Sequence, residues 1–492
     1  MLLFHSIFSF SAAASLLALS TGAYVIYQCF LSPLAKIPGP FWAKLTYWYQ
    51  VYYAIQGNSH RDFVTLHEKY GPVVRVGPND VSVADPVAFR EIYKPGGGFN
   101  KAPSYDVLRG ARTFDLAGQR DEKIHSEQRK LVARAYSMNS LVHLEPNVDV
   151  VIRTMMQKLG GLSGAVDLSA FLHFFAFDVI GAVSFSHPFG YIHAGDDQGI
   201  FMRIRMAMNS ISWLLHVRWF FDLHQKLRPV IGNWLAANDR NGFFFQFAQR
   251  EIMDRKDRDG DDRDIINQLF TVQKAKPHLT NTDMAFMMTT NVFAGADTTS
   301  TSLNAIFYLL LTNPVVYQRL MAEFEEKKSR GELSELVTFE QAESCRYLQA
   351  VMHEAIRLYP AAGTILPREV PAGGMRIKNY FVPAGTVVGS SGWIIHRVPA
   401  IWGPDFEQFR PERWLDENAG ELKRFFFSFG GGSRTCIGRN ISWLEMSKLI
   451  PTLLMRYDVK LAPGAKLTEY SGALVFLQGL NVLLTPRQTA VA

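Results

Sequence analysis

The chain has 492 residues, of which 48% are hydrophobic and 13% aromatic, so it can bury a large core. Its formal net charge of +6 is modest for this length, and no basic-aromatic repeat accompanies it, so we expect no nucleic-acid partner. Its three cysteines, Cys29, Cys345 and Cys436, argue against a disulfide-stapled extracellular fold and lie too far apart in sequence for a four-thiolate iron–sulfur centre or a paired-cysteine zinc site.

Residues 1–30 predict a membrane anchor. Residues 1–35 contain no Lys, Arg, Asp or Glu, and residues 7–30 are mostly apolar. About 20 apolar residues in a helix span the hydrocarbon layer. Lys36 and Lys44 follow, which predicts that the rest of the chain stays in the cytosol. A cleaved signal peptide is the alternative, but such peptides usually have a basic start and a shorter apolar core.

Residues 31–45 predict a proline-rich hinge, which leads into a catalytic domain at residues 46–492. Prolines at positions 33, 38 and 40 prevent a continued helix and stiffen an extended chain. A plain surface loop would have a similar sequence, so the hinge rests on its place next to the anchor.

The catalytic domain shows mainly helical patterns and one early β region. Residues 73–84 alternate apolar and polar side chains about a Gly-Pro-Asn-Asp turn and predict a β-hairpin. Residues 254–264 are mostly charged and predict a solvated loop. Long helices are expected at residues 121–136, 283–312, 314–330 and 339–358. The fold class is therefore mainly α with a small β region (α+β).

The helix at residues 283–312 carries polar groups in an otherwise apolar stretch, around Asp297 and Thr298. Gly295 costs an interior helix about 1 kcal/mol relative to alanine, so helix stability does not explain it. Thr298 can donate back to the carbonyl of Ala294 and loosen the helix there, which leaves a groove for a small molecule. The alternative is that Asp297 forms a buried salt bridge and the threonines only pack.

Glu354 and Arg357 lie three residues apart and therefore share one face of a predicted helix. Most such pairs are exposed and contribute little to stability. This helix is largely apolar, however, and Arg413 downstream could complete a buried Glu–Arg–Arg cluster.

Cys436 follows a glycine-rich bend at residues 430–432. Glycines let a chain fold closely enough to direct backbone N–H groups at one sulfur, as a metal-binding thiolate requires. The alternative is a buried cysteine that acts as a small apolar side chain.

These features together resemble the cytochrome P450 superfamily. The cysteine loop has the pattern of the proximal-ligand loop of that family, complete at Phe429, Gly432, Arg434, Cys436 and Gly438. Residues 294–299 resemble the Ala-Gly-x-Asp-Thr-Thr element of its oxygen-binding helix. Residues 112–115 and 120–129 look like microsomal fungal enzymes of the pisatin demethylase-like group. The resemblance implies the cytochrome P450 fold, preceded by a single N-terminal transmembrane helix, and haem b as the cofactor.

The resemblance assigns the cysteine loop to the haem. Cys436 would be the axial thiolate ligand of the iron, and Phe429 would lie over the ring near the sulfur. Arg434 would pair with a haem propionate. Gly432 belongs to the bend, and Gly438 would let the following helix pack close to the ring.

The family pattern also implies further haem contacts. His125 and Arg129, one helical turn apart, and Arg368 would bind the propionates, although an exposed cation is the alternative for each. His125 stands where the family usually has tryptophan, so its hydrogen bond could change with pH as the imidazole titrates. Ala294 and Gly295 would line the oxygen-binding groove.

The remaining implied roles concern proton supply and structure. Asp297 and Thr298 would relay protons to dioxygen bound at the iron. Glu354, Arg357 and Arg413 would hold the core around the cysteine loop.

The implied function is that of a haem-thiolate monooxygenase acting on an apolar organic substrate by hydroxylation, epoxidation or oxidative demethylation, in fungal secondary-metabolite (terpenoid or polyketide) biosynthesis. A haem-thiolate isomerase or dehydratase, a demethylase that detoxifies plant phytoalexins, and a non-catalytic haem-binding protein remain as alternatives. The expected location is the endoplasmic reticulum membrane. The chain would cross it once, with the catalytic domain in the cytosol.

The chain has no Gly-x-Gly-x-x-Gly fingerprint for a nicotinamide or flavin domain, so electrons would come from a separate NADPH–cytochrome P450 reductase, with cytochrome b5 as a further partner. The basic residues that could form the docking face are Arg129, Lys130, Arg134, Arg439 and Lys448. Aromatic residues that could dip into the bilayer are Trp213, Trp219, Phe220 and Phe221. The substrate pocket is expected from residues 103–116, 210–219, 291–294, 361–366 and 474–477.

Overall fold

The computed structural model describes residues 2–110, 112–234, 242–255 and 263–487. The longer helices are α1 (Leu2–Ile26), α3 (Trp48–Gln56), α4 (Ser59–Tyr70), α5 (Pro86–Tyr93), α7 (Glu122–Val132), α9 (Glu145–Gly160), α10 (Leu168–Phe185), α12 (Ile200–Leu214), α13 (Arg218–Ile231), α14 (Phe243–Arg255), α15 (Ile265–Ala275), α16 (Asn281–Thr312), α17 (Pro314–Ser329), α19 (Arg346–Leu358) and α23 (Arg439–Arg456). Short helices between them are α2 (Phe41–Leu45), α6 (Tyr105–Arg109), α8 (Met138–Leu141), α11 (Tyr191–Ala194), α18 (Phe339–Ser344), α20 (Gly392–Ile395), α21 (Pro399–Trp402) and α22 (Ala419–Leu422).

Four small sheets complete the fold. The largest has the order β1-β2-β7-β4, built from β1 (Val73–Gly77), β2 (Asp80–Val83), β7 (Val387–Gly389) and β4 (Arg368–Glu369). The others are β3-β11-β8 (Ala165–Asp167, Asn481–Pro486, Tyr457–Leu461), β9-β10 (Thr468–Ser471, Val475–Gln478) and β5-β6 (Met375–Ile377, Tyr380–Val382). The predicted hairpin is confirmed, with Val73 opposite Val83, and β2 pairs in parallel with β7.

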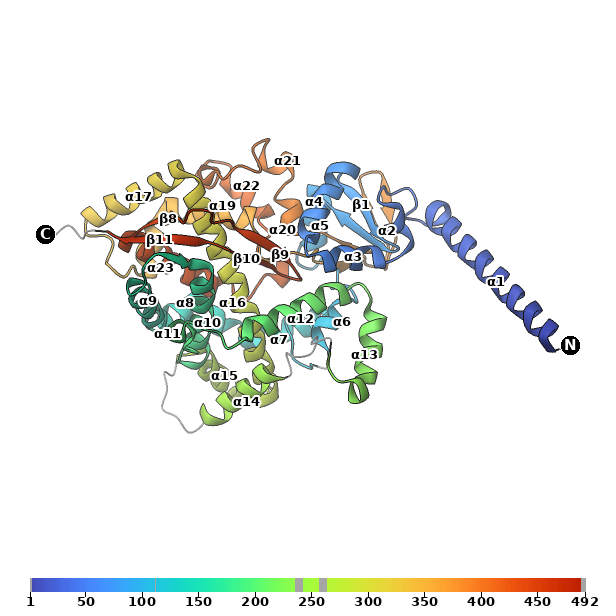
Figure 1. Cartoon of the computed structure of the whole chain (residues 1–492), viewed down its shortest axis with the longest axis horizontal. Coiled ribbons are helices and arrows are strands. Elements are labelled where there is room, and N and C mark those ends of the chain that lie inside the picture. The colour runs from blue at the N-terminus through green and yellow to red at the C-terminus, as the bar shows by residue number, and fades with distance from the viewer. Residues whose placement is uncertain (1, 111, 235–241, 256–262, 488–492) are drawn as a thin grey trace.

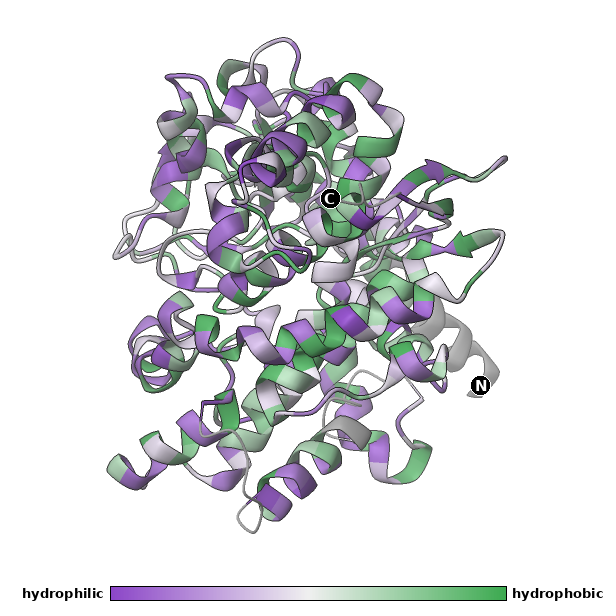
Figure 2. Cartoon of the chain, turned by 90° about the vertical axis from the view of Figure 1, so that its left-hand side faces the viewer, coloured by the Kyte–Doolittle hydropathy of each residue, from purple (hydrophilic) through white to green (hydrophobic). Residues whose placement is uncertain are grey.

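Helix α16 runs through the middle of the helical body (Figure 1). It is 32 residues long and begins at a capping box, in which Thr280 and Asp283 satisfy each other's backbone N–H groups. Helix α10 packs along it and is almost entirely buried. In Figure 2, hydrophilic and hydrophobic segments alternate along the outer helices, as expected for amphipathic helices that cover a core.

The helix predicted at residues 339–358 is not continuous. It is divided into α18 and α19 at Cys345, which has ψ 89° and is buried. The start of α19 is capped from α17, because the Glu323 carboxylate accepts hydrogen bonds from the N–H groups of Tyr347 (2.8 Å) and Leu348 (3.0 Å).

The helix predicted at 121–136 ends as α7 at Val132 and continues as a 3₁₀ turn. Of the predicted loop at 254–264, residues 256–262 lie outside the described residues.

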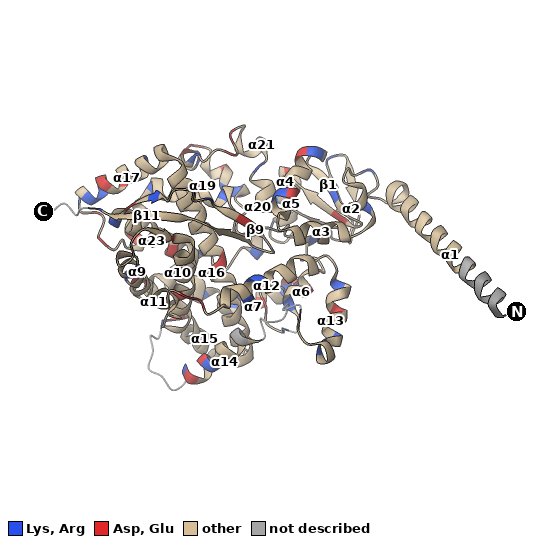
Figure 3. Ribbon diagram, viewed as in Figure 1, with Lys and Arg blue, Asp and Glu red and all other residues tan. Residues whose placement is uncertain are grey.

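Helix α1 projects away from the body (Figure 1), and its described part carries no charged side chain (Figure 3). Residues Ala12–Leu31 form an apolar stretch long enough to cross a membrane. Helix α10 passes the same test of length and composition, but it is mostly buried and serves as a core helix.

The segment after α1 packs on the body. Leu34 and Ile37, within the predicted hinge, are almost fully buried in the cluster that includes β1. The buried Arg75 guanidinium donates to the backbone oxygens of Gln28 (2.8 Å) and Pro78 (2.6 Å). The end of the apolar helix is therefore tied to the first sheet.

A buried carboxylate, Glu354, joins three parts of the chain. It accepts hydrogen bonds from Arg357 Nε and Nη2 and from Arg413 Nε, each at 2.8 Å, and from Trp414 Nε1 at 2.9 Å. Arg357 Nη1 donates to the carbonyl of His396. All three charged side chains are at most 2% exposed. The predicted Glu–Arg–Arg cluster is therefore present and buried.

His396 links this cluster to the cysteine loop. Its Nδ1 hydrogen-bonds the Arg357 carbonyl, which can only accept, and its Nε2 accepts from the Phe427 N–H, both at 2.8 Å. These partners require the neutral Nδ1–H tautomer. Burial and the Arg357 charge lower the pKa of His396 well below its usual value, which agrees with that tautomer.

We predict that Glu354→Gln lowers the free energy of unfolding by about 3–5 kcal/mol, because it leaves the buried Arg357 guanidinium without a counter-charge and leaves Arg413 only the Asp405 carboxylate, at 3.4 Å. Urea unfolding followed by far-ultraviolet circular dichroism measures this loss. Glu326→Gln is the control, since Glu326 and its partner Arg330 are exposed and their pair contributes little. Equal stabilities of the Glu354 and Glu326 variants would contradict the prediction.

Candidate active site

The cysteine loop lies between Phe425 and α23 and is shaped by its glycines. Gly430 and Gly432 have φ values of 69° and 62°, which favour glycine. At Gly432 a Cβ would also lie 2.2 Å from the Tyr93 carbonyl oxygen, so the loop can approach α5 only with glycine there. The Cys436 N–H closes the bend by donating to the Phe429 carbonyl at 2.8 Å.

The Cys436 thiol is exposed but closely surrounded by protein, so burial raises its pKa. The backbone N–H groups of Gly438 and Arg439 and the charge of Arg129 lower the pKa in opposition. Such donors stabilise the thiolate, which is the metal-binding form.

Positively charged groups gather beside this loop. Arg368 is buried, and Arg434 donates to the Glu122 carboxylate (2.8 Å) and to the backbone carbonyls of Gln119 and Arg120. Arg129 donates to the Thr435 carbonyl at 2.7 Å. The structure thus brings together the three arginines that the sequence predicted near the cofactor.

His125 completes this group as a buried imidazole. It is 2% exposed, and its Nδ1 has no hydrogen-bond partner among the described residues. Burial, followed by the charges of Arg434 and Lys101, lowers its pKa to about 3, so it is neutral at physiological pH.

Lys101 belongs to the same cluster, although no local pattern of residues indicated it. It is 6% exposed and donates to the carbonyls of Leu116 (3.1 Å) and Ala117 (2.7 Å). Burial and the charges of Arg434 and Arg368 lower its pKa well below the usual value. These cations lie close enough to disfavour one another's charged forms, and an imidazole without a partner lies among them. Such a cluster suits a ligand that carries two carboxylates, as haem does, because negative charge stabilises the charged forms.

Ala294 and Thr298 lie on the face of helix α16 that lines a cavity. The predicted back-bond is present, because Thr298 Oγ1 donates to the Ala294 carbonyl at 2.8 Å. Gly295 also allows close helix packing, since a Cβ there would lie 2.9 Å from Ile180 Cδ1 of α10.

Asp297 is buried and has a partner that the sequence did not reveal. His173 Nε2, from α10, hydrogen-bonds Asp297 Oδ1, and the His173 ring stacks on Phe201 with centroids 3.7 Å apart. Asp297 Oδ2 is buried without a hydrogen-bond partner among the described residues. The His173 side chain is 15% exposed, against 2% for Asp297, so it lies between the carboxylate and the surface.

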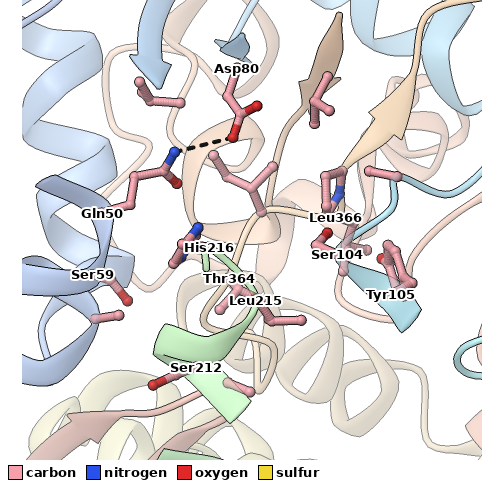
Figure 4. Close-up of a pocket in the computed structure, with 18 of the residues that line it drawn as sticks. Gln50, Ser59, Asp80, Ser104, Tyr105, Ser212, Leu215, His216, Thr364 and Leu366 are labelled. Atoms are coloured by element: carbon pink, nitrogen blue, oxygen red, sulfur yellow. Dashed lines mark hydrogen bonds between the residues drawn. The ribbon is translucent and has the colours of Figure 1, made fainter. Parts of the chain in front are cut away.

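A cavity of about 680 Å³ opens beside α16, a size that suits a drug-sized organic molecule. All five segments predicted to line it contribute side chains, among them Tyr105, Trp219, Phe293, Leu366 and Leu474. The N-terminal part also contributes, through α3, α4 and the β1–β2 hairpin, which the sequence analysis did not anticipate. Figure 4 shows part of this lining.

Two predicted surface residues prove to be buried. Lys448 is fully buried and forms ion pairs with Glu145 and Asp149, so its proposed place on a docking face is wrong. Phe221 is 4% exposed, so it cannot enter a bilayer as predicted, whereas Trp219 is 60% exposed.

This chain is similar in sequence to a known protein family and to several fungal enzymes. The profile of the family "Cytochrome P450" matches residues 37–484. Cytochrome P450 monooxygenase hepC of Aspergillus oryzae is 52% identical over 477 residues, which cover 92% of this chain and 93% of that protein. Cytochrome P450 monooxygenase cicH of Emericella nidulans is 34% identical over 453 residues, covering 88% and 90%. A pisatin demethylase of Fusarium vanettenii is 33% identical over 452 residues, covering 90% and 88%.

These matches run through both helix α16 and the cysteine loop, and they agree with a mostly helical fold that carries small sheets. The expected fold and enzyme class are therefore confirmed. The chain belongs to the cytochrome P450 family of haem-thiolate monooxygenases.

Proposed function

We propose that this enzyme oxygenates an apolar terpenoid or polyketide in fungal secondary metabolism, inserting one atom of dioxygen by hydroxylation, epoxidation or oxidative demethylation. The observation that carries the proposal is the Cys436 thiol, held by backbone N–H groups next to a cationic cluster. When bound, haem b with a cysteinate ligand supplies oxygen activation, since the thiolate donates electron density that favours O–O cleavage.

The residues around the loop would hold the cofactor in the following way. Cys436 would bind the iron, and Phe429, Gly432 and Gly438 would shape the surface against the ring. The carboxylates would be met by the half-buried Arg434 and Arg129 and by the buried donors His125 and Arg368. Glu354, Arg357 and Arg413 act at a distance, because they fix the position of the loop through His396.

Asp297 and Thr298 would supply protons from the cavity side. His173 can accept a proton from solvent at Nδ1 and release one from Nε2 to Asp297 Oδ1, with which it is hydrogen-bonded. Rotation of the protonated Asp297 carboxyl group would then bring the proton to the side of Oδ2, which has no hydrogen-bond partner among the described residues, and towards Thr298, the next residue, which lines the cavity. The groove at Ala294 and Gly295 leaves room beside this hydroxyl.

Electrons would come from an NADPH–cytochrome P450 reductase, with cytochrome b5 as an additional donor. Lys130, Arg134 and Arg439 are exposed basic residues near the cysteine loop and suit an acidic partner. Arg439 is the first residue of α23, three positions after Cys436.

The enzyme would be anchored in the endoplasmic reticulum membrane by α1, which crosses once and leaves the catalytic domain in the cytosol. Exposed aromatic residues next to the end of α1 support a body that lies on the bilayer, notably Trp42 (65% exposed) and Trp48 (52% exposed). Trp219 belongs to the same kind of exposed apolar surface and also lines the cavity.

Oxidative demethylation of an aromatic methyl ether is a second candidate reaction, because pisatin demethylases align over most of the chain. Release of formaldehyde from a methoxylated substrate would distinguish it from simple hydroxylation. An isomerase or dehydratase would turn over without NADPH, and the retained Asp297–Thr298 pair disfavours it.

We predict that Cys436→Ser abolishes the red-shifted Soret band of the reduced carbon monoxide complex and all NADPH-dependent product formation, because a hydroxyl does not replace the thiolate. Absorption spectra of the purified holoprotein with its reductase test this. Cys29→Ser, which alters a cysteine near α1, should keep both properties. A normal spectrum in the Cys436 variant would refute the proposed function.

We predict that Asp297→Asn reduces product formation by about 10²–10⁴-fold and raises the solvent deuterium isotope effect, because the variant side chain cannot pass on a proton. His173→Phe should preserve the stack on Phe201 and cause a smaller loss in the same direction. Ser302→Ala is the control, as it removes a hydroxyl that bonds only the Thr298 carbonyl. An unchanged isotope effect in both Asp297 and His173 variants would contradict the relay.

We predict that deleting residues 1–26 moves most of the protein from a carbonate-washed membrane pellet to the supernatant and leaves the carbon monoxide spectrum unchanged. The deletion keeps Gln28, so its contacts with Arg75 survive. Immunoblots of fractionated cells measure the distribution. Retention of the shortened chain in the washed pellet would show that α1 is not the anchor.

A further inference from the structure

The cavity beside α16 is mostly apolar, but it contains one imidazole. His216 lies in the turn after α12, and it is the one histidine among the described residues that line this cavity. Burial alone lowers its pKa to about 4, with no contribution from a charge or a hydrogen bond. The ring is therefore neutral and offers one donor and one acceptor that no described residue meets.

Ser212, one turn earlier on α12, faces the same space. It is 1% exposed, and its hydroxyl donates to the Asn209 carbonyl at 2.7 Å, so its oxygen can still accept a hydrogen bond. Figure 4 shows His216 within the lining, between the hydrogen-bonded pair Gln50–Asp80 and Ser212. The polar groups of α12 thus share one part of the cavity with those of α3 and β2.

This polar part and Thr298 are supplied by different elements of the cavity wall, α12 with its following turn and α16. Helix α12 packs against α3, α6 and α13, whereas the main neighbours of α16 are α10, α14 and α19. A molecule that fills the cavity can therefore contact both His216 and Thr298.

The charges around the cavity favour an uncharged ligand. Arg218 is the one arginine or lysine among the described lining residues, and it is already paired with Asp106 at 2.7 Å. Asp62 and Asp80 also line the cavity, and burial raises the pKa of both, that of Asp80 to about 6. A carboxylate ligand would meet acidic groups there and no free cation.

We propose that His216 and Ser212 form a subsite for an uncharged oxygen of the substrate, a hydroxyl or a carbonyl, at the end of the molecule that lies away from Thr298. The His216 ring is half-buried, so a ligand that displaces water from it must supply a hydrogen bond or leave a polar group unpaired, which is costly. This inference rests on the proposed monooxygenase function and narrows its substrate to a molecule that is already partly oxygenated. An earlier step must therefore introduce or retain an oxygen on the carbon skeleton.

The test uses rigid probes that differ in one group: biphenyl, 4-hydroxybiphenyl and biphenyl-4-carboxylate. Isothermal titration calorimetry on the full-length holoenzyme in lipid nanodiscs gives the dissociation constant of each. The ratio of the biphenyl constant to the 4-hydroxybiphenyl constant is compared between wild type and variants, so that partitioning of the probes into lipid cancels.

We expect this ratio to fall about tenfold in His216→Phe, which keeps a ring but no hydrogen-bonding group, and to recover partly in His216→Gln. Ser212→Ala should lower it less. Biphenyl should bind these variants as it binds wild type, and the carboxylate should bind no better than biphenyl.

Equal ratios in wild type and His216→Phe would overturn the proposal, and so would tighter binding of the carboxylate. A naphthalene and 1-naphthol pair repeats the comparison with a shorter molecule, and failure of both phenols to bind wild type also overturns it. None of these results affects the carbon monoxide spectrum, so the subsite can fail while the monooxygenase function stands.

Discussion

The site depends on the interaction of the buried Glu354 carboxylate with two arginines, Arg357 and Arg413. The carboxylate holds Arg357 of its own helix and Arg413 from a segment almost 60 residues later, and both guanidinium groups also bind backbone carbonyls. Because every guanidinium nitrogen has an acceptor, the network favours one geometry. His396 transmits that geometry to Phe427, nine residues before Cys436. The charged cluster is thus linked to the cysteine loop by hydrogen bonds, although it does not touch the sulfur.

Burial acts in two ways in the same molecule. At His396 it favours a neutral tautomer whose two nitrogens both have partners, so the imidazole is a structural link. At His125 and His216 it also favours the neutral form, but His125 Nδ1 and the ring of His216 lack partners among the described residues. A polar group that loses water without gaining a partner is costly. We therefore infer that other molecules meet these two imidazoles, the cofactor at the buried His125 and the substrate at the half-buried His216.

The sequence predicted the contacts that depend on local spacing. Glu354 and Arg357 are one helical turn apart, and Thr298 bonds the carbonyl four residues before it, so periodicity was sufficient for both. Contacts between distant segments were not predictable in this way. Glu323 divides a predicted helix by capping α19 from α17, and His173 reaches Asp297 from α10. Lys448 is charged, yet Glu145 and Asp149 of α9 allow its burial, which no local pattern of residues could indicate.

The arrangement of polar groups in the cavity bears on selectivity. An apolar lining alone would hold a hydrocarbon in several orientations of similar energy, because the hydrophobic effect has no preferred direction. A hydrogen bond at His216 would favour one of these orientations, since only one end of a partly oxygenated substrate can form it. The opposite end then lies beside Ala294 and Thr298, where the loosened turn of α16 meets the cavity. Which carbon reacts would thus be decided at the far end of the cavity from the reaction, through positioning of the substrate and not through the chemistry itself.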